Sequence, residues 1–304
     1  MIEGVLVVDK PEGMTSHDVV AFARRSLGQS RIGHTGTLDP FATGVLPLAC
    51  GRATRLVRFM SAADKTYEGT IRFGLVTDTY DITGTEVART DARPSADAVL
   101  ATIETLRGEP LQTPPSFSAK KVGGRRAYDL ARKQEPVALA PVAVRLRHVD
   151  IISLTPERAL VRLTCSAGYY VRSFAHDLGT RLGVGACLET LRRTRSGHFE
   201  LSQAITLSAL DAGGGPHALI RLEELLPELD AVVVGATGRD RVRHGQTIRP
   251  EDLIRALGGA IDVRPGDEMA ATDWVRVIDE AGALLGVAKR GAQDEPLRPN
   301  IVLT

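Results

Sequence analysis

The chain has 304 residues, enough for one large domain or two ordinary ones with a substantial core. Its hydrophobic fraction of 43% and charged fraction of 25% are those of an ordinary globular protein, and no apolar run is long enough to predict a membrane span. A formal net charge of +1 excludes a strongly basic or acidic protein, so the placement of the charges says more about ligands than their sum.

The N-terminus and the cysteines favour a cytoplasmic location. A strand-like run, Gly4–Val8, begins almost at once, without the basic and apolar regions of a signal peptide. Cys50, Cys165 and Cys187 are widely spaced and form no CxxC pair and no metal-ligand cluster with the seven histidines. We therefore expect reduced, structural cysteines and no bound metal.

Two helices are predicted on either side of a glycine-rich loop. The first runs over residues 17–27, capped by Thr15 or Ser16 and ended by Gly28. The second covers residues 52–60, with Leu56, Val57 and Met60 inward. Its three arginines, Arg52, Arg55 and Arg58, are predicted to form a solvated face.

The loop of residues 31–44 carries a single acid, Asp39. Pro40 disfavours the helical region at the preceding residue, so Asp39 should lie in an extended loop. Leu38 and Phe41 flank the acid with apolar surface, which raises the pKa of a carboxyl group unless a cation pairs with it. Three glycines permit a positive φ or a close backbone approach: Gly33, Gly36 and Gly44. The pattern fits either a held catalytic carboxylate or a surface Asp-Pro turn.

Alternation and helical spacing predict the next elements. Residues 67–73 form a strand with Tyr67, Gly69, Ile71 and Phe73 on one side. A polar loop follows over residues 77–84. Residues 95–106 form a helix whose inward positions are Val99, Leu100, Ile103 and Leu106. Two more strands are predicted over residues 142–154 and 160–165.

The segment Thr113–Glu135 differs from its surroundings. It opens on Pro114-Pro115, contains Gly123-Gly124, and interleaves Phe117 and Tyr128 with basic residues. Six cations, Lys120, Lys121, Arg125, Arg126, Arg132 and Lys133, face only two acids, Asp129 and Glu135. Cations can contact phosphates and rings can stack on bases, so the segment fits either an RNA-binding insertion or a mobile solvated loop.

A helix is predicted to start after Cys165–Val171 and to run to about Leu182. Arg172 lies near its start, where the helix dipole disfavours a cation, so the residue is either paired with an acid or functional. Leu191–Arg195 is a second basic run, and Gly213–Pro216 a flexible stretch.

The remaining residues predict one helix and a small β-rich module. The helix covers residues 221–229. Short strands follow over residues 231–234, 274–278 and 284–288, with a hairpin turn at residues 279–282. The sequence therefore divides into a first domain of residues 1–226, with an insertion at about 112–140, and a module of residues 227–304.

Together these motifs resemble those of the TruB family, bacterial tRNA pseudouridine synthases that act on the T loop. The loop Gly33–Gly44 resembles the family's signature loop. Further motifs follow the family's order: Lys10–Ser16, Lys65–Tyr67, Thr77–Asp81, the inserted Pro115–Tyr128, Cys165–Arg172 and Leu191–Thr194. The C-terminal module resembles a PUA domain through Arg243–Gln246 and Trp274–Val277.

The resemblance implies a fold class and a set of roles. The fold is α+β, a mixed, largely antiparallel sheet flanked by helices, with a small β-rich PUA-like module. Asp39 is the catalytic aspartate, Tyr67 stacks on the target uracil, and Arg172 is the basic partner of the aspartate. The substrate-binding residues are His34, Tyr170, Leu191, Lys10, Asp81, Lys120, Lys121, Arg125 and Arg126. The chain departs from the family pattern at Tyr169, where the family has a threonine.

The implied reaction breaks the N1–C1′ bond of uridine, turns the uracil and rejoins it through C5. Because nothing is oxidised, reduced or hydrolysed overall, we expect no cofactor. The expected partner is the T stem-loop of tRNA at position 55, bound by a monomer that needs no obligate protein partner and no membrane.

An ionised Asp39 can assist in three ways: attack on C1′, addition to C6, or stabilisation of an oxocarbenium-like centre. Each needs a charged carboxylate in a water-poor pocket, and the Arg172 guanidinium offsets the cost of burying that charge. Two alternatives stay open. The chain can be a guide-dependent pseudouridine synthase, or an RNA-folding chaperone whose catalysis is secondary.

Overall fold

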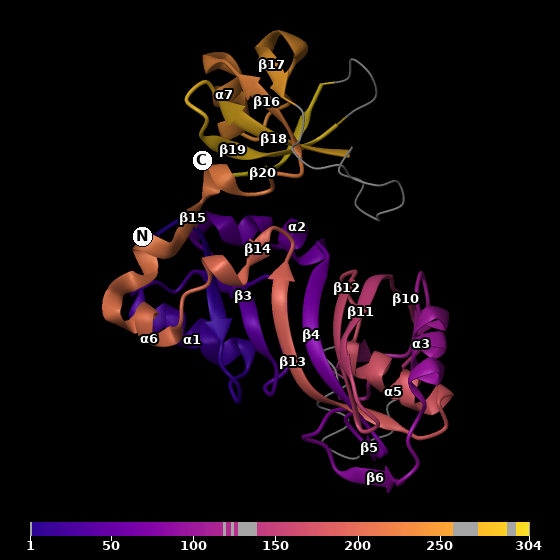
Figure 1. Cartoon of the computed structure of the whole chain (residues 1–304). Helices are drawn as coiled ribbons and strands as arrows, with labels where there is room; N and C mark the ends of the chain where they lie inside the picture. Colours follow the sequence, from indigo (N-terminus) through magenta and orange to yellow (C-terminus); the bar gives the residue numbers. More distant parts are fainter. Residues whose placement is uncertain are drawn as a thin grey trace.

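The computed structural model of the protein describes residues 2–117, 120–122, 125–126, 139–257, 273–290 and 296–303. Over these residues the chain forms a nine-stranded sheet with helices against it, followed by a five-stranded C-terminal sheet (Figure 1). This confirms the predicted α+β fold class. No helix in these ranges is long and apolar enough to cross a membrane.

The large sheet has the strand order β11-β12-β4-β13-β3-β1-β15, with β14 paired to β13 and β2 paired to β3. Its neighbours are antiparallel except β13 and β3, which run parallel. The strands are β1 (Gly4–Lys10), β2 (Ile32–His34), β3 (Thr43–Cys50), β4 (Lys65–Phe73), β11 (Leu146–Leu154), β12 (Arg158–Cys165), β13 (Ala186–Ser196), β14 (Phe199–Glu200) and β15 (Leu219–Arg221).

The apolar first strand is explained by packing on both faces of the sheet. In β1, Leu6 and Val8 belong to the main core, whereas Val5 and Val7 face a second core on the other side. A strand that is buried on both faces reads as a continuous apolar run without alternation, as Gly4–Val8 does. All four side chains are fully buried.

Helices and short turns connect these strands. They are α1 (Ser16–Ser26), η1 (Gly51–Leu56), α2 (Val57–Ala62), α3 (Ala96–Thr105), α5 (Val171–Arg181), η2 (Leu201–Gln203), α6 (Leu207–Ala209), η3 (Leu210–Gly214), η4 (Gly215–Ala218) and η5 (Leu222–Glu224). Thr15 caps α1: its side chain accepts from the Asp18 backbone N–H, and Asp18 accepts from the Thr15 backbone in return. Smaller strand pairs are β5 (Leu75–Thr77) with β6 (Glu86–Arg89), β7 (Leu111–Gln112) with β10 (Val142–Ala143), and β8 (Lys121–Val122) with β9 (Arg125–Arg126).

Two predicted features of the first 229 residues are wrong. In α3, Val99 and Ile103 are buried but Leu100 is 51% exposed, because it lies off the face that packs on the sheet. Residues 221–229 do not form a helix. The short turn η5 is followed by Leu226 with φ of +56°, and Leu222, Leu225 and Leu229 enter the second core from an irregular segment.

The C-terminal module is a five-stranded sheet with the strand order β17-β16-β18-β19-β20 (Figure 1). Its elements are β16 (Asp230–Val234), α7 (Ala236–Arg243), η6 (Pro250–Asp252), β17 (Leu253–Leu257), β18 (Trp274–Asp279), β19 (Leu284–Lys289) and β20 (Arg298–Val302). The three predicted strands and their hairpin turn are confirmed. The sequence reading missed α7, β17 and β20.

Of the arginines of η1 and α2, Arg55 and Arg58 are exposed, as predicted, and Arg52 is half-buried, but all three also bond to the C-terminal residues. Arg52 and Arg55 donate to the backbone carbonyls of Leu303 and Val302, at the end of β20. Arg58 donates to Asn300 Oδ1 at 2.5 Å. The side chains thus attach the last strand to the first half of the chain.

Candidate active site

The Asp39 loop joins β2 to β3 and is shaped by contacts along its backbone. Ser16 Oγ accepts from the Leu38 N–H at 2.8 Å, and its hydroxyl lies 3.2 Å from the Leu38 carbonyl. The Ala42 N–H donates to the Asp39 carbonyl at 3.1 Å. The Asp39 side chain is 35% exposed, so the carboxylate reaches solvent from a fixed backbone. These contacts disfavour the reading of a loose surface turn.

The three glycines of this loop are not equivalent. Gly44 has φ of +101°, and a Cβ there would lie 2.2 Å from the Arg193 carbonyl oxygen. Gly33 has no positive φ and open space around it, and a Cβ at Gly36 would make an ordinary contact with Arg193. Only Gly44 needs both the positive φ and the close approach.

Arg172 joins Asp39 to a second carboxylate. Its Nε lies 2.9 Å from Asp39 Oδ2, and its Nη2 donates to Asp39 Oδ1 at 3.1 Å. On the other side Nη1 lies 3.4 Å from Asp81 Oδ2 and donates to the Thr79 carbonyl at 3.1 Å. Arg172 is in the first turn of α5, as expected, and the two acids account for a cation at a helix start.

The loop that carries Asp81 was predicted as polar from its residues, and the family resemblance implied a substrate-binding role for Asp81. Asp81 is 3% exposed, and its Oδ1 accepts from the hydroxyls of Thr79 and Thr83. Tyr80 has φ of +64°, and its ring stacks on His176 of α5 with centroids 3.8 Å apart. The loop is therefore packed against the same helix that carries Arg172.

Opposing effects act on the charge of Asp39. Burial raises the pKa of this carboxyl above its ordinary value, and the Arg172 guanidinium opposes the rise. The neighbouring Asp81 adds to the rise through repulsion between like charges. Desolvation and Asp81 thus favour the protonated acid, and Arg172 favours the carboxylate.

Lys10 lies beneath the loop and is fully buried. Its Nζ donates to the carbonyls of Pro11, Met14 and Pro40 at 2.8, 2.6 and 3.1 Å. Burial lowers the pKa of Lys10 to about 8, against the attraction of Asp39. The lysine therefore supports the loop immediately after Asp39.

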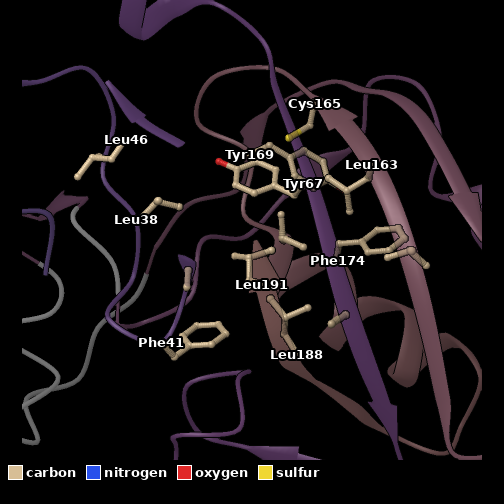
Figure 2. Packing of buried hydrophobic residues seen from close by; sticks show 14 of the residues in the cluster. Leu38, Phe41, Leu46, Tyr67, Leu163, Cys165, Tyr169, Phe174, Leu188 and Leu191 are labelled. Carbon is tan, nitrogen blue, oxygen red and sulfur yellow. The ribbon is translucent and has the colours of Figure 1, made fainter. Parts of the chain in front are cut away.

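An aromatic and aliphatic group lies beside the loop. Tyr67 of β4 and Leu191 of β13 are 9% and 7% exposed and belong to the same core as Leu38 and Phe41. In the view of Figure 2, Tyr67 and Tyr169 lie close together above Leu191, with Phe41 across from them. Burial raises the pKa of Tyr67, so its hydroxyl stays neutral.

His34 and Tyr170 are less directly connected to Asp39. His34 is half-buried on β2, its ring meets His17 edge-to-face at 5.4 Å, and burial lowers its pKa. Tyr170 caps α5, and its backbone exchanges hydrogen bonds with the Gln112 side chain at 2.8 and 3.0 Å.

The basic segment begins at the site. The Phe117 carbonyl accepts from Arg172 Nη2 at 2.9 Å, and Lys120 is exposed. Lys121 and Arg126 pair across β8 and β9, as do Val122 and Arg125. The side chains of Lys121, Arg125 and Arg126 lie outside the described part, as do the whole residues Gly123, Gly124, Tyr128, Asp129, Arg132, Lys133 and Glu135.

Two residues that contact this region were not predicted as site residues. Arg193 is 1% exposed and donates to carbonyls of the Asp39 loop. Ser16 was predicted as a possible helix cap and as part of the Lys10–Ser16 motif, without a role at the site. The alternation of β13 was masked by its run of polar residues, so the sequence offered no sign that one arginine of Leu191–Arg195 points inward.

Known proteins match this chain along most of its length. Residues 24–171 match the model of the TruB family pseudouridylate synthase N-terminal domain, and residues 172–233 match that of the tRNA pseudouridylate synthase B C-terminal domain. The tRNA pseudouridine synthase B of Solibacter usitatus is 41% identical over 293 residues, which cover 95% of this chain and 96% of that protein. The enzyme of the same name from Heliobacterium modesticaldum is 40% identical, over 97% and 92% of the two chains.

Solved structures resemble the fold as a whole. A Cbf5–Nop10–Gar1 complex contains a chain with a TM-score of 0.76 and 25% identity, over 99% of this chain and 85% of that one. An H/ACA RNP bound to a substrate RNA containing 2′-deoxyuridine gives a TM-score of 0.75 at 24% identity, with the same coverage. The likeness extends over both sheets.

Proposed function

The chain belongs to the TruB family of pseudouridylate synthases, and from this premise we propose that it converts uridine to pseudouridine at position 55, in the T loop of tRNA. The observation that carries the proposal is Asp39 in a fixed loop, with both carboxylate oxygens held by Arg172. The reaction is an isomerisation: the N1–C1′ bond breaks, a C5–C1′ bond forms, and the proton lost from C5 is balanced by one gained at N1.

In this proposal Asp39 acts in its ionised form on the nucleotide. Arg172 keeps the charge on the carboxylate and fixes the direction of its oxygens. Asp81 holds Arg172 from the other side, so the guanidinium is aimed by two acids. Removing Arg172 would leave the buried Asp81 without its cation, at a cost of up to about 3–5 kcal/mol by analogy with broken buried pairs, and solvent would screen the smaller loss at the partly exposed Asp39.

The uridine must leave the RNA stack to reach Asp39, at a cost of a few kcal/mol. Tyr67 offers a ring for the uracil, and stacking contributes about 1–3 kcal/mol per base. His34, Tyr170 and Leu191 are proposed to contact the flipped nucleotide.

Other residues are proposed to hold the pocket and the RNA. Lys10 and Asp81 support the pocket. Lys120, Lys121, Arg125 and Arg126 of the insertion at about 112–140 bind the RNA backbone. We propose residues 1–226 as the catalytic domain and residues 227–304 as a PUA-like RNA-binding domain. We also propose that the protein works as a cytoplasmic monomer, which suits a tRNA substrate.

The test is Asp39→Asn, which keeps the size of the side chain and removes its charge. We expect no pseudouridine in tRNA treated with this variant, with RNA affinity within about threefold of the wild type, because the charge acts on the chemical step. Mapping of pseudouridine by mass spectrometry or reverse transcription reads the product. Asp97→Asn, an exposed acid on α3, is the matched control and should be fully active. Turnover by Asp39→Asn would refute the catalytic role.

One alternative is guide-dependent modification, since the fold resembles a chain of a Cbf5–Nop10–Gar1 complex. The purified chain should modify bare tRNA if our proposal holds, whereas a guide-dependent enzyme should not. The chaperone alternative predicts that Asp39→Asn promotes tRNA folding as well as the wild type does, although it forms no pseudouridine.

A further inference from the structure

Arg193 is one of the most deeply buried charged residues of the described chain. Its side chain is enclosed between β13 and the Asp39 loop, with 1% of its surface exposed. Nε donates to the Val45 carbonyl at 2.7 Å, and Nη2 donates to the Gly36 carbonyl at 3.0 Å. Nη1 lies 3.4 Å from the Thr37 carbonyl.

All of these acceptors are neutral. Among the described residues, no carboxylate lies within salt-bridge distance of Arg193, whereas Arg172 has two. A buried charge without a counter-ion costs free energy that carbonyl dipoles only partly return. If this position only filled space, a leucine or methionine of similar volume would do so without the cost of burying a charge. We therefore infer that the arginine contributes through its hydrogen bonds to the loop.

The contacts of Arg193 hold the backbone on both sides of Asp39. Gly36 and Thr37 precede Asp39, and Val45 follows it at the start of β3. The Arg193 backbone is also in register with Gly44 in the parallel pairing of β13 and β3. One residue therefore fixes both ends of the segment, and the planar guanidinium can reach acceptors in several directions at once.

The rest of the segment is held by other side chains. Ser16 holds Leu38, Arg172 holds the Asp39 carboxylate, and Lys10 holds the Pro40 carbonyl. Arg193 thus supplies the anchor for the two peptides that directly precede Leu38. Without Arg193 the loop keeps the contacts to Ser16, Arg172 and Lys10. The backbone that follows β2 is then no longer held at its carbonyl groups.

We propose that Arg193 is a positioning residue, which places Asp39 for the uridine reaction by clamping the two ends of its loop; this rests on the proposed function above. It does not contact the Asp39 carboxylate; besides the loop carbonyls, its guanidinium hydrogen-bonds the Tyr67 hydroxyl, which lies on the other side of the site. Its effect is on the geometry of attack, where a displacement of about 1 Å can cost about 100-fold in rate.

The test compares Arg193→Met and Arg193→Lys with the wild type. Methionine keeps the apolar volume and loses every donor, while lysine keeps the charge but not the planar fork. We expect the single-turnover rate at saturating tRNA, per folded molecule, to fall about 10- to 100-fold for methionine and less for lysine. The tRNA Kd should stay within about threefold. Arg162→Met is the matched control: this exposed arginine on β12 pairs with Glu68 and should keep its rate within about twofold.

Thermal unfolding separates positioning from support of the fold. If the Arg193 variants unfold at lower temperature but each folded molecule keeps the wild-type rate, the residue is purely structural and the proposal fails. Where Arg193→Met does not fold, Arg193→Lys decides: a rate loss above about fivefold with unchanged Kd supports positioning, and a smaller loss overturns it. If the wild-type protein makes no pseudouridine, the proposed function is refuted. If the wild type is active and the Arg193 variants are equally active, only the positioning role is refuted.

Discussion

At the scale of single residues, the ionisation of Asp39 is set by a guanidinium that is itself shared. Arg172 contacts Asp39 through two nitrogens and Asp81 through a third. Desolvation and the nearby Asp81 both favour the protonated form of Asp39, and Arg172 favours the charged form. The net shift of the pKa is upward, and the Arg172 guanidinium limits it.

This balance predicts a pH dependence. The pKa of Asp39 is raised, and only the ionised form is active, so kcat/KM should be lost as the pH falls through that pKa and retained above it. Arg172→Met removes the opposing cation and leaves Asp81 in place, so the pKa rises further and the acid limb moves to higher pH. The measurement is kcat/KM from about pH 5 to about pH 9. Arg162→Met, an exposed arginine paired with Glu68, is the control.

An acid limb at the same pH in Arg172→Met and wild type would contradict this account. It would mean that Arg172 orients the substrate or the loop without controlling the charge of Asp39. A lower rate at every pH is expected in addition, because the carboxylate oxygens lose their fixed direction.

At the scale of elements, the site depends on the parallel pairing of β3 with β13. Strands β3 and β13 meet at Arg192–Thr43 and Arg193–Gly44, directly after the Asp39 loop. Gly44 lets the two backbones approach more closely than any side chain would allow. The end of the loop therefore lies against β13, the strand that carries Leu191 and Arg193.

Gly44→Ala should be strongly destabilising. The new Cβ would lie 2.2 Å from the Arg193 carbonyl oxygen, in a backbone conformation with φ of +101°. We expect a loss of about 3 kcal/mol or more, because backbone strain and a steric clash act together. Gly33→Ala, in β2 with open space around it, should cost less than about 1 kcal/mol. Urea unfolding of both variants measures the difference. Equal stability of the two would show that β3 can move away from β13.

The sequence predicted the elements in which apolar side chains follow the period of a strand or a helix. Prediction failed where an unusual backbone conformation or a buried charge interrupts that period. Residues 67–73 alternate and form β4. Strand β13 was missed because Arg193, at an inward position, looks like part of a solvated basic run. The helix predicted over residues 221–229 had the right leucines, but Leu226 at positive φ and Pro227 end regular structure there.

The candidate site was predictable to the extent that its chemistry violates local rules. A cation at the start of α5 and an acid between apolar neighbours are both visible in the sequence, and the structure pairs them. Contacts from Arg193 and Ser16 to carbonyl and amide groups leave no such sign. These contacts depend on tertiary packing, and a side chain that bonds a distant backbone group has no characteristic local sequence pattern.

At the scale of the whole molecule, a second core joins the two sheets. It combines Val5 of β1, Phe59 of α2 and Leu225 of the connecting segment with Val287 and Ile301 of the C-terminal module. The guanidinium of Arg58 lies 4.7 Å from the ring centroids of both Phe59 and Trp274. A shared core and a row of arginines indicate that the module is held in a fixed place relative to the large sheet.

Trp274 makes this coupling measurable, because it is the only tryptophan of the chain and meets Phe59 edge-to-face at 5.3 Å. We expect urea unfolding followed by tryptophan fluorescence and by far-UV circular dichroism to coincide in the wild type, since both sheets share one core. Arg58→Ala removes the cation from both rings and the hydrogen bond to Asn300, and should cost about 1–2 kcal/mol. Its fluorescence transition should then come at lower urea than the dichroism transition, as the module separates first. Arg162→Ala, far from the module, should leave the two transitions together. Separate transitions already in the wild type would mean that the C-terminal module folds independently and that the second core does not couple it to the catalytic half.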